Sequence, residues 1–335
     1  MNIIGLTNQH SGCGYHRVIL PLAFMDNIKG YVTNLITEDK VDGWDILLYN
    51  RMSQYDGDWQ KVKDELKCKV VIDLDDYWRL PPGHVNYFEY EANKDRIENN
   101  IRNADMVTVT NENIASRVRP LNSNVHVFAN GIPFGKNQFI EDKRQSDRVR
   151  IFWAGGISHQ RDIAMLRNPV KKLKVHRDKI QMILGGCSDA PGRVKLIWDS
   201  MFSAFTAGGQ LPYMKLHGTS PTSYMQMYEN ADIMVIPLED SEWHGCKSNL
   251  KILEAATKKI PCIVSNVAPY NRDKDVPVLW VNSQKDWVEH LNYLILNPSA
   301  REELGNKFYE WAKEKYNLEK INAARKSAFE NLCAA

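Results

Sequence analysis

The chain has 335 residues, of which 43% are hydrophobic and 25% charged, and its formal net charge is +2. This composition is typical of a globular protein and excludes a disordered or collagen-like chain, while the length suits two domains. A near-neutral charge neither implies nor excludes nucleic-acid binding, because a basic patch can lie within a balanced total.

The cysteines and the N-terminus bear on metal binding and location. Six cysteines are scattered along the chain without a Cys-x-x-Cys pair, so we expect no zinc site and reduced core thiols. The first ten residues lack a basic segment followed by a long apolar run, so we expect no signal peptide. No apolar stretch approaches the ~20 residues of a membrane span. These features predict a cytoplasmic protein without a membrane span.

Short apolar runs alternate with amphipathic segments in the first half of the chain. The predicted strands are 2–7, 45–50, 69–75, 105–110 and 124–130. The predicted helices are 15–28, 59–67, 93–104 and 111–121. Pro21 must lie near the start of the first helix or kink it. Nearly continuous apolar strands that alternate with helices are typical of a parallel sheet covered on both faces.

The alternation of predicted strands and helices stops at residue 135 and resumes at residue 150. Residues 135–149 are polar, charged and poorly periodic, and we interpret them as a linker. Further strands are predicted at 150–156, 180–186, 213–218, 232–238, 260–265 and 276–281, and the tail from residue 301 is predicted to be helical. We therefore expect two Rossmann-like α/β domains, 1–140 and 150–315, and a C-terminal helix, 316–335, that braces the first domain. Ligands bind beyond the C-terminal ends of parallel strands, so two facing sheets would hold one in the cleft between them.

The first glycine loop follows the first predicted strand. Gly12 and Gly14 lie in "SGCGYHRV" just before a helix, and Arg17 follows them. Backbone N–H groups at such a helix start can hold an anion, and Arg17 would add positive charge. An ordinary turn with a surface arginine explains the motif equally well.

A second glycine loop opens the second half of the chain. In "WAGGISHQRDI", Gly155 and Gly156 stand between a strand and a helix and are followed by His159 and Arg161. Two such loops suit a diphosphate that carries a group at each end, although His159 could instead be a plain capping residue. The spacing Gly-x-Gly-x-x-Gly is missing, which argues against a dinucleotide redox site.

Three carboxylates lie at the end of the strand predicted at 69–75. Asp73 and Asp75 share one side of the strand if it extends that far, and Asp76 follows. Such a cluster could bind a metal, take a proton or bind sugar hydroxyls. One of the three could equally be a helix cap or a solvated acid.

The segment "GCKSNLKILEAATKKIPCIVS" places two lysines near a helix start and one acid inside it. Lys247 and Lys251 are four residues apart and would share a helix face, with Glu254 further along. Cations near a helix N-terminus oppose the helix dipole unless an anion binds there, and Ser248 and Asn249 would add donors. Glu254 could accept two hydrogen bonds from a ribose diol. The alternative is a solvated surface helix in which Lys251 and Glu254 pair.

These motifs together resemble retaining GT-B glycosyltransferases of the family-four-like type, in the variant found in many bacterial and phage members. The resemblance covers nearly the whole chain, and its order and spacing are specific although each motif is short. It rests on "GYHRVILPL", "VIDLDDYW", "ADMVTVTNENIASRV", "VFANGI", "WAGGISHQRD", "LHGTSPTSYMQMYENADIMVIPL" and "EWHGCKSNLKILEAATKKIPCIVS".

The resemblance implies a nucleotide-sugar donor in the second domain, with UDP as the most favoured nucleotide. Glu254 would hold the ribose hydroxyls, and Gly155 and Gly156 would approach the diphosphate. Arg161 and Lys247 would neutralise the diphosphate in place of a metal, so no metal site is expected.

Further roles come from the same resemblance. The segment at His217 and Gly218 would flank the base, Gly14 would contact phosphate or acceptor, and Asp76 would position the acceptor hydroxyl. The better-known family pattern has a first glutamate eight positions before the second, and Cys246 stands there in this chain. Which group contacts the transferred sugar therefore stays open between Lys247, Ser248 and backbone groups.

The predicted function is sugar transfer to a hydroxyl with retention, by front-face attack within an ion pair. A glycan or a lipid is the expected acceptor, and the absence of a Lys/Arg-rich amphipathic N-terminal helix favours the glycan. A phage-type enzyme acting on hydroxymethylated bases in DNA is an alternative, with Lys171, Lys172, Lys174 and Arg177 as a phosphate-facing patch. A sugar-nucleotide epimerase and a non-catalytic nucleotide-sugar sensor are further alternatives.

Overall fold

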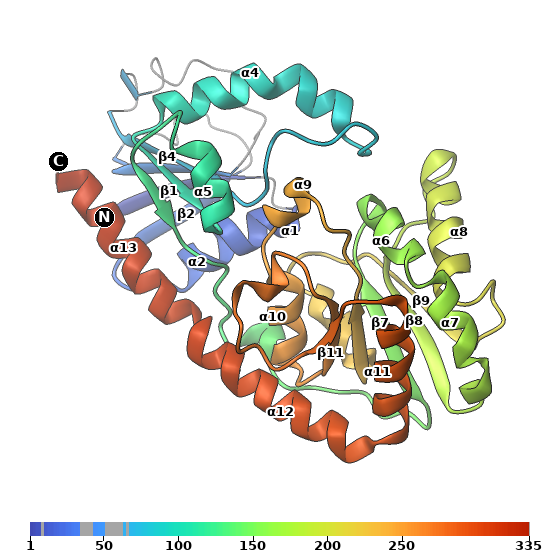
Figure 1. Ribbon diagram of the computed structural model, residues 1–335. Coiled ribbons are helices and arrows are strands. Elements are labelled where there is room, and N and C mark those ends of the chain that lie inside the picture. The colour runs from blue at the N-terminus through green and yellow to red at the C-terminus, as the bar shows by residue number, and fades with distance from the viewer. Residues whose placement is uncertain (8–9, 34–42, 51–62, 65–66, 335) are drawn as a thin grey trace. The chain divides into compact units, whose positions relative to one another are not determined.

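The computed structural model describes residues 1–335 except 8–9, 34–42, 51–62, 65–66 and 335, and the chain forms two compact units (Figure 1). Unit 1 comprises Met1–Pro133, Gly245–Ser248 and Tyr316–Ala335. Unit 2 comprises Phe134–His244 and Asn249–Lys315. The helix predicted at 59–67 lies mostly outside the described residues.

Unit 1 is built on a six-stranded sheet in the order β2-β1-β3-β4-β5-β6. Every pair of neighbouring strands is parallel. The strands are β1 (Asn2–Leu6), β2 (Lys29–Thr33), β3 (Ile46–Asn50), β4 (Lys69–Leu74), β5 (Met106–Val109) and β6 (Val125–Val127). The sequence analysis did not anticipate β2, whose sequence KGYVT is largely exposed at the sheet edge.

Alternate residues of each strand pack on opposite faces of this sheet. Ile4 belongs to a core cluster with residues of α4 (Tyr87–Asn103) and α5 (Glu112–Val118). Its neighbour Ile3 belongs to a second cluster, on the other face, that includes Phe329 and Leu332 of α13 (Leu318–Ala334). This is the two-residue period of a strand buried on both sides.

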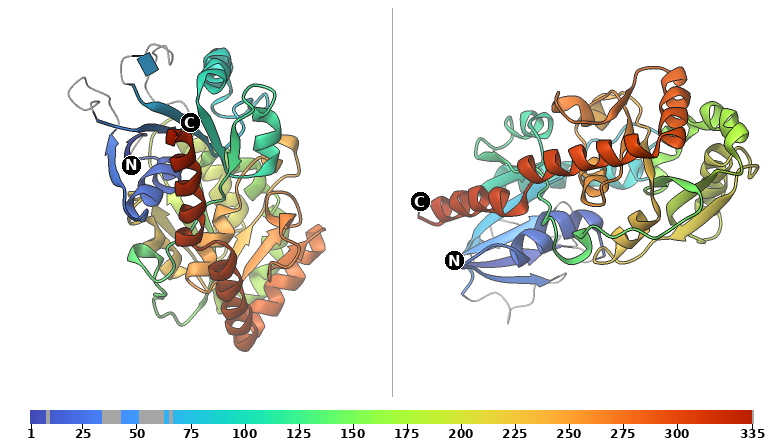
Figure 2. Two further views of the ribbon diagram at one scale, coloured as in Figure 1. Left: turned by 90° about the vertical axis from the view of Figure 1, so that its left-hand side faces the viewer. Right: turned by 90° about the horizontal axis from the view of Figure 1, so that it is seen from below.

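The C-terminal helix α13 is thus part of the core of unit 1, and it lies along the sheet in the further views (Figure 2). Gly131 permits its close approach, because a Cβ atom there would lie 2.7 Å from the Cα atom of Leu318. Ile132 and Asn317 also form a parallel bridge. The start of α13 is therefore fixed to residues 131–132, at the end of the range Met1–Pro133 of unit 1.

The first helical region of unit 1 changes geometry along its length. It runs through α1 (Gly12–Gly14), the π-helical segment Tyr15–Ile19 and α2 (Leu20–Ala23). Pro21 lies in the first turn of α2, directly after the π-helical turn. Proline lacks an N–H group and is best tolerated in a first turn, so the predicted irregularity is present at this position.

Unit 2 is built on a second six-stranded parallel sheet, in the order β12-β11-β10-β7-β8-β9. Numbered along this unit alone, the order is 3-2-1-4-5-6, which is typical of Rossmann folds. The strands are β7 (Val149–Ala154), β8 (Ile180–Cys187), β9 (Tyr213–His217), β10 (Ile233–Ile236), β11 (Cys262–Ser265) and β12 (Leu279–Val281). The predicted pair of Rossmann-like α/β sheets is therefore confirmed.

Helices cover this sheet. Phe152 and Trp153, which are neighbours in β7, contact different helical segments. Trp153 packs against Trp198 of α8 (Arg193–Phe205), and Phe152 packs against Tyr228 of the segment Tyr224–Asn230. The helices are α6 (Gln160–Ala164), α7 (Arg167–Lys172), α8 (Arg193–Phe205), α9 (Glu242–Gly245), α10 (Leu250–Thr257), α11 (Gln284–Leu296) and α12 (Pro298–Lys315). None of the helices in the described part of the chain has the length and apolar character of a membrane span.

The segment interpreted as a linker, residues 135–149, belongs to unit 2 and packs against the rest of it. Phe139 is fully buried, and the side chain of Gln138 bonds to the backbone of Pro221 and Met225. Lys143 forms an ion pair with Asp232. The polar composition of this segment therefore reflects a surface strap rather than a free connection.

Candidate functional site

The strand order of unit 2 reverses between β7 and β10, and ligands of open parallel sheets bind beyond the strand ends at such a point. Gly155 and Gly156 follow the end of β7 directly. Glu239 lies three residues beyond the end of β10. The second glycine loop is thus placed where this architecture binds its ligands.

Lys251 lies against the glycine loop. Its Nζ atom donates a hydrogen bond of 2.6 Å to the carbonyl oxygen of Ala154 and lies 5.4 Å from the centre of the Trp153 ring. A Cβ atom at residue 155 would lie 2.9 Å from this Nζ atom and equally close to the Trp153 ring. Position 155 therefore requires glycine, whereas Gly156 is exposed with open space around it.

A polar cluster is built around His159 and Asp162, which follow the glycine loop in the sequence. The Nδ1 atom of His159 lies 2.6 Å from Oδ2 of Asp162, and the other carboxylate oxygen of Asp162 accepts a 2.9 Å hydrogen bond from the N–H of Glu239. Asp162, Glu239 and His244 bring potential ligand atoms within 4.8 Å of one another. The sequence analysis did not anticipate this cluster, whose residue types are also metal ligands.

Glu254 of α10 is buried, with a relative exposure of 5%. Its carboxylate accepts hydrogen bonds from the hydroxyl groups of Tyr224 and, at 2.6 Å, Tyr228. Burial and the neighbouring Glu254 raise the pKa of Tyr228 well above its usual range. Glu254 is therefore an interior acceptor, which excludes a solvated surface pair with Lys251.

The helix that carries Lys251 and Glu254 begins at Leu250, with Asn249 at its N-cap position. Lys247 and Ser248 precede this helix and belong to unit 1, whereas Asn249 belongs to unit 2. The prediction that Lys247 and Lys251 share a helix face is therefore wrong, because the four-residue spacing applies only within one helix.

Amide side chains at the start of α5 donate hydrogen bonds to the backbone of residues 245–247, all within unit 1. Asn111 donates hydrogen bonds to the carbonyl oxygens of Cys246 (3.0 Å) and Lys247 (3.3 Å), and Asn113 donates one to Gly245 (2.7 Å). Cys246 is itself part of the apolar core of this unit. Its thiol is therefore buried in that core.

In unit 1, Lys247 lies beside Asp76, with 3.7 Å between its Nζ atom and a carboxylate oxygen. Both side chains are mostly buried but keep some exposure. Burial lowers the pKa of His84, and the positive charge of Lys247 lowers it further against the opposing effect of Asp76. Asp76, Lys247 and His84 thus form a small charged group in unit 1.

Arg17 lies inside unit 1 rather than at a ligand site. Its guanidinium is almost fully buried and makes two hydrogen bonds with Asp73, at 2.9 and 2.8 Å. It also donates to the carbonyl oxygen of Phe128 and to the side chain of Asn130. The expected contact between Arg17 and an anion is therefore incorrect, because its donors are used within the core.

The remaining predicted site residues, Gly14, Arg161 and Gly218, lie elsewhere in the fold. The N–H of Gly14 is directed at the Ser11 side chain, at 3.4 Å, and Gly14 is buried. Arg161 is exposed on α6. Gly218 is exposed just after β9 and donates to the carbonyl oxygen of Cys187. The structure thus groups the glycine loop, His159, Lys251 and Glu254 in unit 2, and Asp76 with Lys247 in unit 1.

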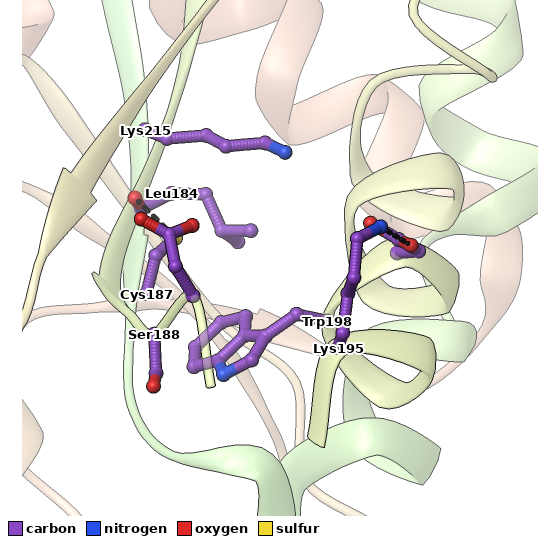
Figure 3. Close-up of a pocket in the computed structure, with 8 residues that line it drawn as sticks. Leu184, Cys187, Ser188, Lys195, Trp198 and Lys215 are labelled. Carbon is purple, nitrogen blue, oxygen red and sulfur yellow. Dashed lines mark hydrogen bonds and ion pairs between the residues drawn. The ribbon is translucent and has the colours of Figure 1, made fainter. Parts of the chain in front are cut away.

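A separate cavity of about 140 Å³ opens between β8, β9 and α8 (Figure 3). Its charges are largely paired, since Lys195 contacts Asp199 at 2.6 Å and Asp189 lies 3.5 Å from His217. Burial raises the pKa of the Cys187 thiol to about 11. None of the predicted site residues lines it, and its residues are Leu184, Cys187, Ser188, Asp189, Lys195, Trp198, Asp199 and Lys215.

Sequence reasoning missed three features of this site. Lys251 contacts the glycine loop, Tyr224 and Tyr228 bond to Glu254, and Glu239 joins the cluster around Asp162. The sequence held a signal only for Lys251, because it lies three residues before Glu254 on one helix face. The others depend on contacts between elements that are distant in the sequence.

Solved structures with a similar fold include sucrose-phosphate synthase from Thermosynechococcus elongatus and Anabaena HepE in complex with UDP and glucose. The first is 11% identical, with a TM-score of 0.69 over 99% of both chains. The second is 12% identical, with a TM-score of 0.66 over 99% of this chain and 100% of HepE.

A third similar structure is TarM, which is 15% identical with a TM-score of 0.58 over 85% of this chain. The chain spans about half the length of TarM, since the match covers 54% of it. No family model and no curated protein matches the sequence. At these identities the likeness establishes a shared two-domain Rossmann-like fold, and it gives no support to hydroxymethylated DNA as an acceptor.

Proposed function

We propose that the chain is a retaining glycosyltransferase of the GT-B type that transfers a sugar from a UDP-sugar to a hydroxyl group of a glycan. The observation that carries this proposal is the contact of Lys251 with the glycine loop at the switch point of unit 2, on the helix α10 that also holds the buried carboxylate of Glu254. The similar structures support it, because one holds UDP and glucose and another is a sucrose-phosphate synthase.

The donor is proposed to lie over the strand ends of unit 2. The exposed backbone at Gly156 would approach the diphosphate, and the ammonium group of Lys251 would offset its charge, with Arg161 and His159 as further cations or donors. Asn249 would add a donor at the start of α10. The loop at Gly218 would flank the base.

Glu254 is proposed to bind the ribose. Its two oxygens already accept hydroxyl groups, one from Tyr228 in the interior and one from the half-buried Tyr224. A ribose diol offers the same kind of donor, so it could take the place of Tyr224 without leaving the carboxylate unpaired.

The acceptor is proposed to use the charged group of unit 1. Asp76 would accept a hydrogen bond from the incoming hydroxyl, with the Nζ atom of Lys247 3.7 Å from its carboxylate. Ser248 would add a donor beside Lys247. Attack on the face that the diphosphate leaves would retain the anomeric configuration, and it needs no enzymic nucleophile.

A donor screen tests this proposal. The protein is incubated with a panel of nucleotide sugars, and melting temperature, released nucleoside diphosphate and sugar products are measured with and without glycans. The expected result is that one UDP-sugar stabilises the wild type but not Glu254→Ala, and that a glycan acceptor gains the sugar. An altered sugar nucleotide without transfer would indicate an epimerase, an intact donor would indicate a sensor, and absence of binding would overturn the proposal.

A further inference from the structure

The segment from α7 to the start of β8 carries a positive charge that the rest of the chain does not share. Residues 167–179 contain six basic residues and one acid, Asp178, and thus have a net charge of +5. Since the whole chain carries +2, the other residues together carry −3. The near-neutral total therefore conceals a local concentration of positive charge. The basic residues are Arg167, Lys171, Lys172, Lys174, Arg177 and Lys179.

These cations lie on the exposed side of a helical segment. The helix α7 is continued by the 3₁₀-helix Leu173–His176, and apolar side chains such as Leu173 are buried beneath the two. Arg167, Lys171 and Lys174 are spaced by four and three residues, so they follow one another along a side of the segment that stays exposed. The segment is therefore amphipathic, with a cationic outer side.

The six cations make no ion pair with any residue that the structure describes. Exposed lysines on other helices of unit 2 differ, because Lys195, Lys285 and Lys307 each pair with an acid one turn away. Neighbouring charges of one sign repel each other, and an anionic partner would relieve that repulsion. The paired pattern of the solvated helices in this unit is thus absent from residues 167–179.

Two exposed apolar side chains accompany these cations. Val175 follows Lys174 and is 82% exposed, and Leu296, near the end of α11, is 53% exposed. One turn before Leu296, the side chain of Asn292 lies 2.9 Å from the Nε2 atom of His176. The last turns of α11 therefore pack beside the 3₁₀-helix. A surface that presents cations and apolar side chains together is complementary to a partner that is both anionic and apolar.

This surface lies at the N-terminal edge of the unit 2 sheet. β8 begins at Ile180, directly after Lys179, whereas Gly155 follows the C-terminal end of β7. β7 and β8 are parallel neighbours, so the two positions are at opposite edges of the sheet. A partner bound to the cations would therefore leave the strand ends with the glycine loop uncovered.

We propose that residues 167–179, together with Leu296, form a docking surface for a membrane that contains anionic lipids. Each cation near such a membrane adds to the attraction, and Val175 and Leu296 would enter the headgroup region. A nucleic acid would match the cations, but its phosphate and sugar groups offer no apolar layer to these two side chains. The inference does not depend on the proposed function, because it involves neither the donor site nor the acceptor site.

Vesicle sedimentation tests the proposal. The protein is mixed with vesicles of phosphatidylcholine alone, or of phosphatidylcholine and phosphatidylglycerol in equal amounts, at low and at high salt. One variant combines Lys171→Gln, Lys174→Gln and Arg177→Gln, and a second is Val175→Ser. Thermal unfolding without vesicles checks that each variant is folded.

A matched control removes the same amount of charge from elsewhere in unit 2. It combines Lys195→Gln, Lys285→Gln and Lys307→Gln, all at lysines that are paired within their own helices. Binding of the wild type and of every variant to duplex DNA and to heparin is measured in parallel by fluorescence anisotropy.

The wild type is expected to sediment with the anionic vesicles but not with the neutral ones, and less at high salt. The triple variant in residues 167–179 should lose about 100-fold in affinity for the anionic vesicles. Val175→Ser should lose about fivefold, and the matched control should bind as the wild type does.

Absence of vesicle binding, an equal loss in the two triple variants, or unchanged vesicle binding by Val175→Ser would overturn the proposal. Tighter binding to duplex DNA or heparin than to the anionic vesicles, without an effect of Val175→Ser, would also overturn it and would indicate a polyanion as the partner.

Discussion

The ammonium group of Lys251 is hydrogen-bonded, at 2.6 Å, to the carbonyl oxygen of Ala154 at the end of β7. This contact attaches the first turn of α10 to the strand end that carries the glycine loop. A positive charge in this position opposes the dipole of its own helix, and a bound diphosphate would relieve that opposition.

Lys251→Met should weaken donor binding and catalysis, because it removes an ammonium group that contacts the strand end beside the glycine loop. We expect kcat/KM to fall by about 10²- to 10³-fold, as for loss of one group that stabilises developing charge. Steady-state kinetics and UDP titration measure this effect. Lys307→Met removes an exposed lysine of α12 and should change neither quantity. Equal behaviour of the two variants would place Lys251 outside the site.

Tyr228→Phe should destabilise the protein, because it leaves one oxygen of the buried Glu254 without its 2.6 Å donor. The expected loss is about 1–3 kcal/mol in the free energy of unfolding, measured by urea denaturation. A double-mutant cycle with Glu254→Gln should recover part of this loss, since an uncharged amide is less costly to leave unpaired. Purely additive effects would contradict the pairing.

Two buried arginines of unit 1 should respond oppositely to replacement by methionine. Arg17→Met breaks the ion pair with Asp73 and leaves a buried carboxylate, so we expect a loss of about 3–5 kcal/mol. Arg325 is bonded to Asn322, but its Nη2 atom has no partner among the described residues. Burial lowers the pKa of Arg325 to about 9, and the nearby charge of Arg17 adds to this effect.

Arg325→Met should therefore be neutral or raise the melting temperature, because it removes an unpaired buried charge and keeps an apolar stem against Phe128. Calorimetry on both variants measures the contrast. A large loss of stability in Arg325→Met would show that this guanidinium has a stabilising partner in solution.

Asp232 should contribute to stability in a pH-dependent way. Burial alone would raise its pKa, but hydrogen bonds and charges from Arg150 and Lys143 outweigh burial and hold the pKa below its ordinary value. The unfolded chain then binds more protons than the folded one in acid, so this contribution is complete above about pH 4 and is lost as pH falls further. Asp232→Asn should flatten the decline in stability between about pH 5 and 2, measured by urea denaturation, whereas exposed Asp178→Asn should not.

The sheets could be predicted because their strands are buried on both sides. A run such as 46–49, Ile-Leu-Leu-Tyr, is apolar throughout, so its pattern survives without knowledge of its neighbours. The edge strand β2 was missed because its exposed residues lack that pattern. The strand order needed the structure, since parallel neighbours are joined through long connections.

The site was only partly predictable for a similar reason. Glycine spacing and the helix that carries Glu254 are local features, and the sequence placed both the loop after β7 and the acid in α10. The burial of Arg17 depends on Asp73, and the separation of Lys247 from Lys251 depends on where the helix begins. Such outcomes arise from partners that are distant in the sequence, which spacing rules do not include.

The packing of α13 into the core of unit 1 has a consequence for synthesis on the ribosome. Phe329 and Leu332 complete the apolar cluster around Ile3 and Ile46, and they follow the whole of unit 2 in the sequence. Every residue of unit 2 has been synthesised by Lys315. Unit 1 is therefore expected to finish folding after unit 2, and its first strands depend until then on protection from chaperones or on partial structure.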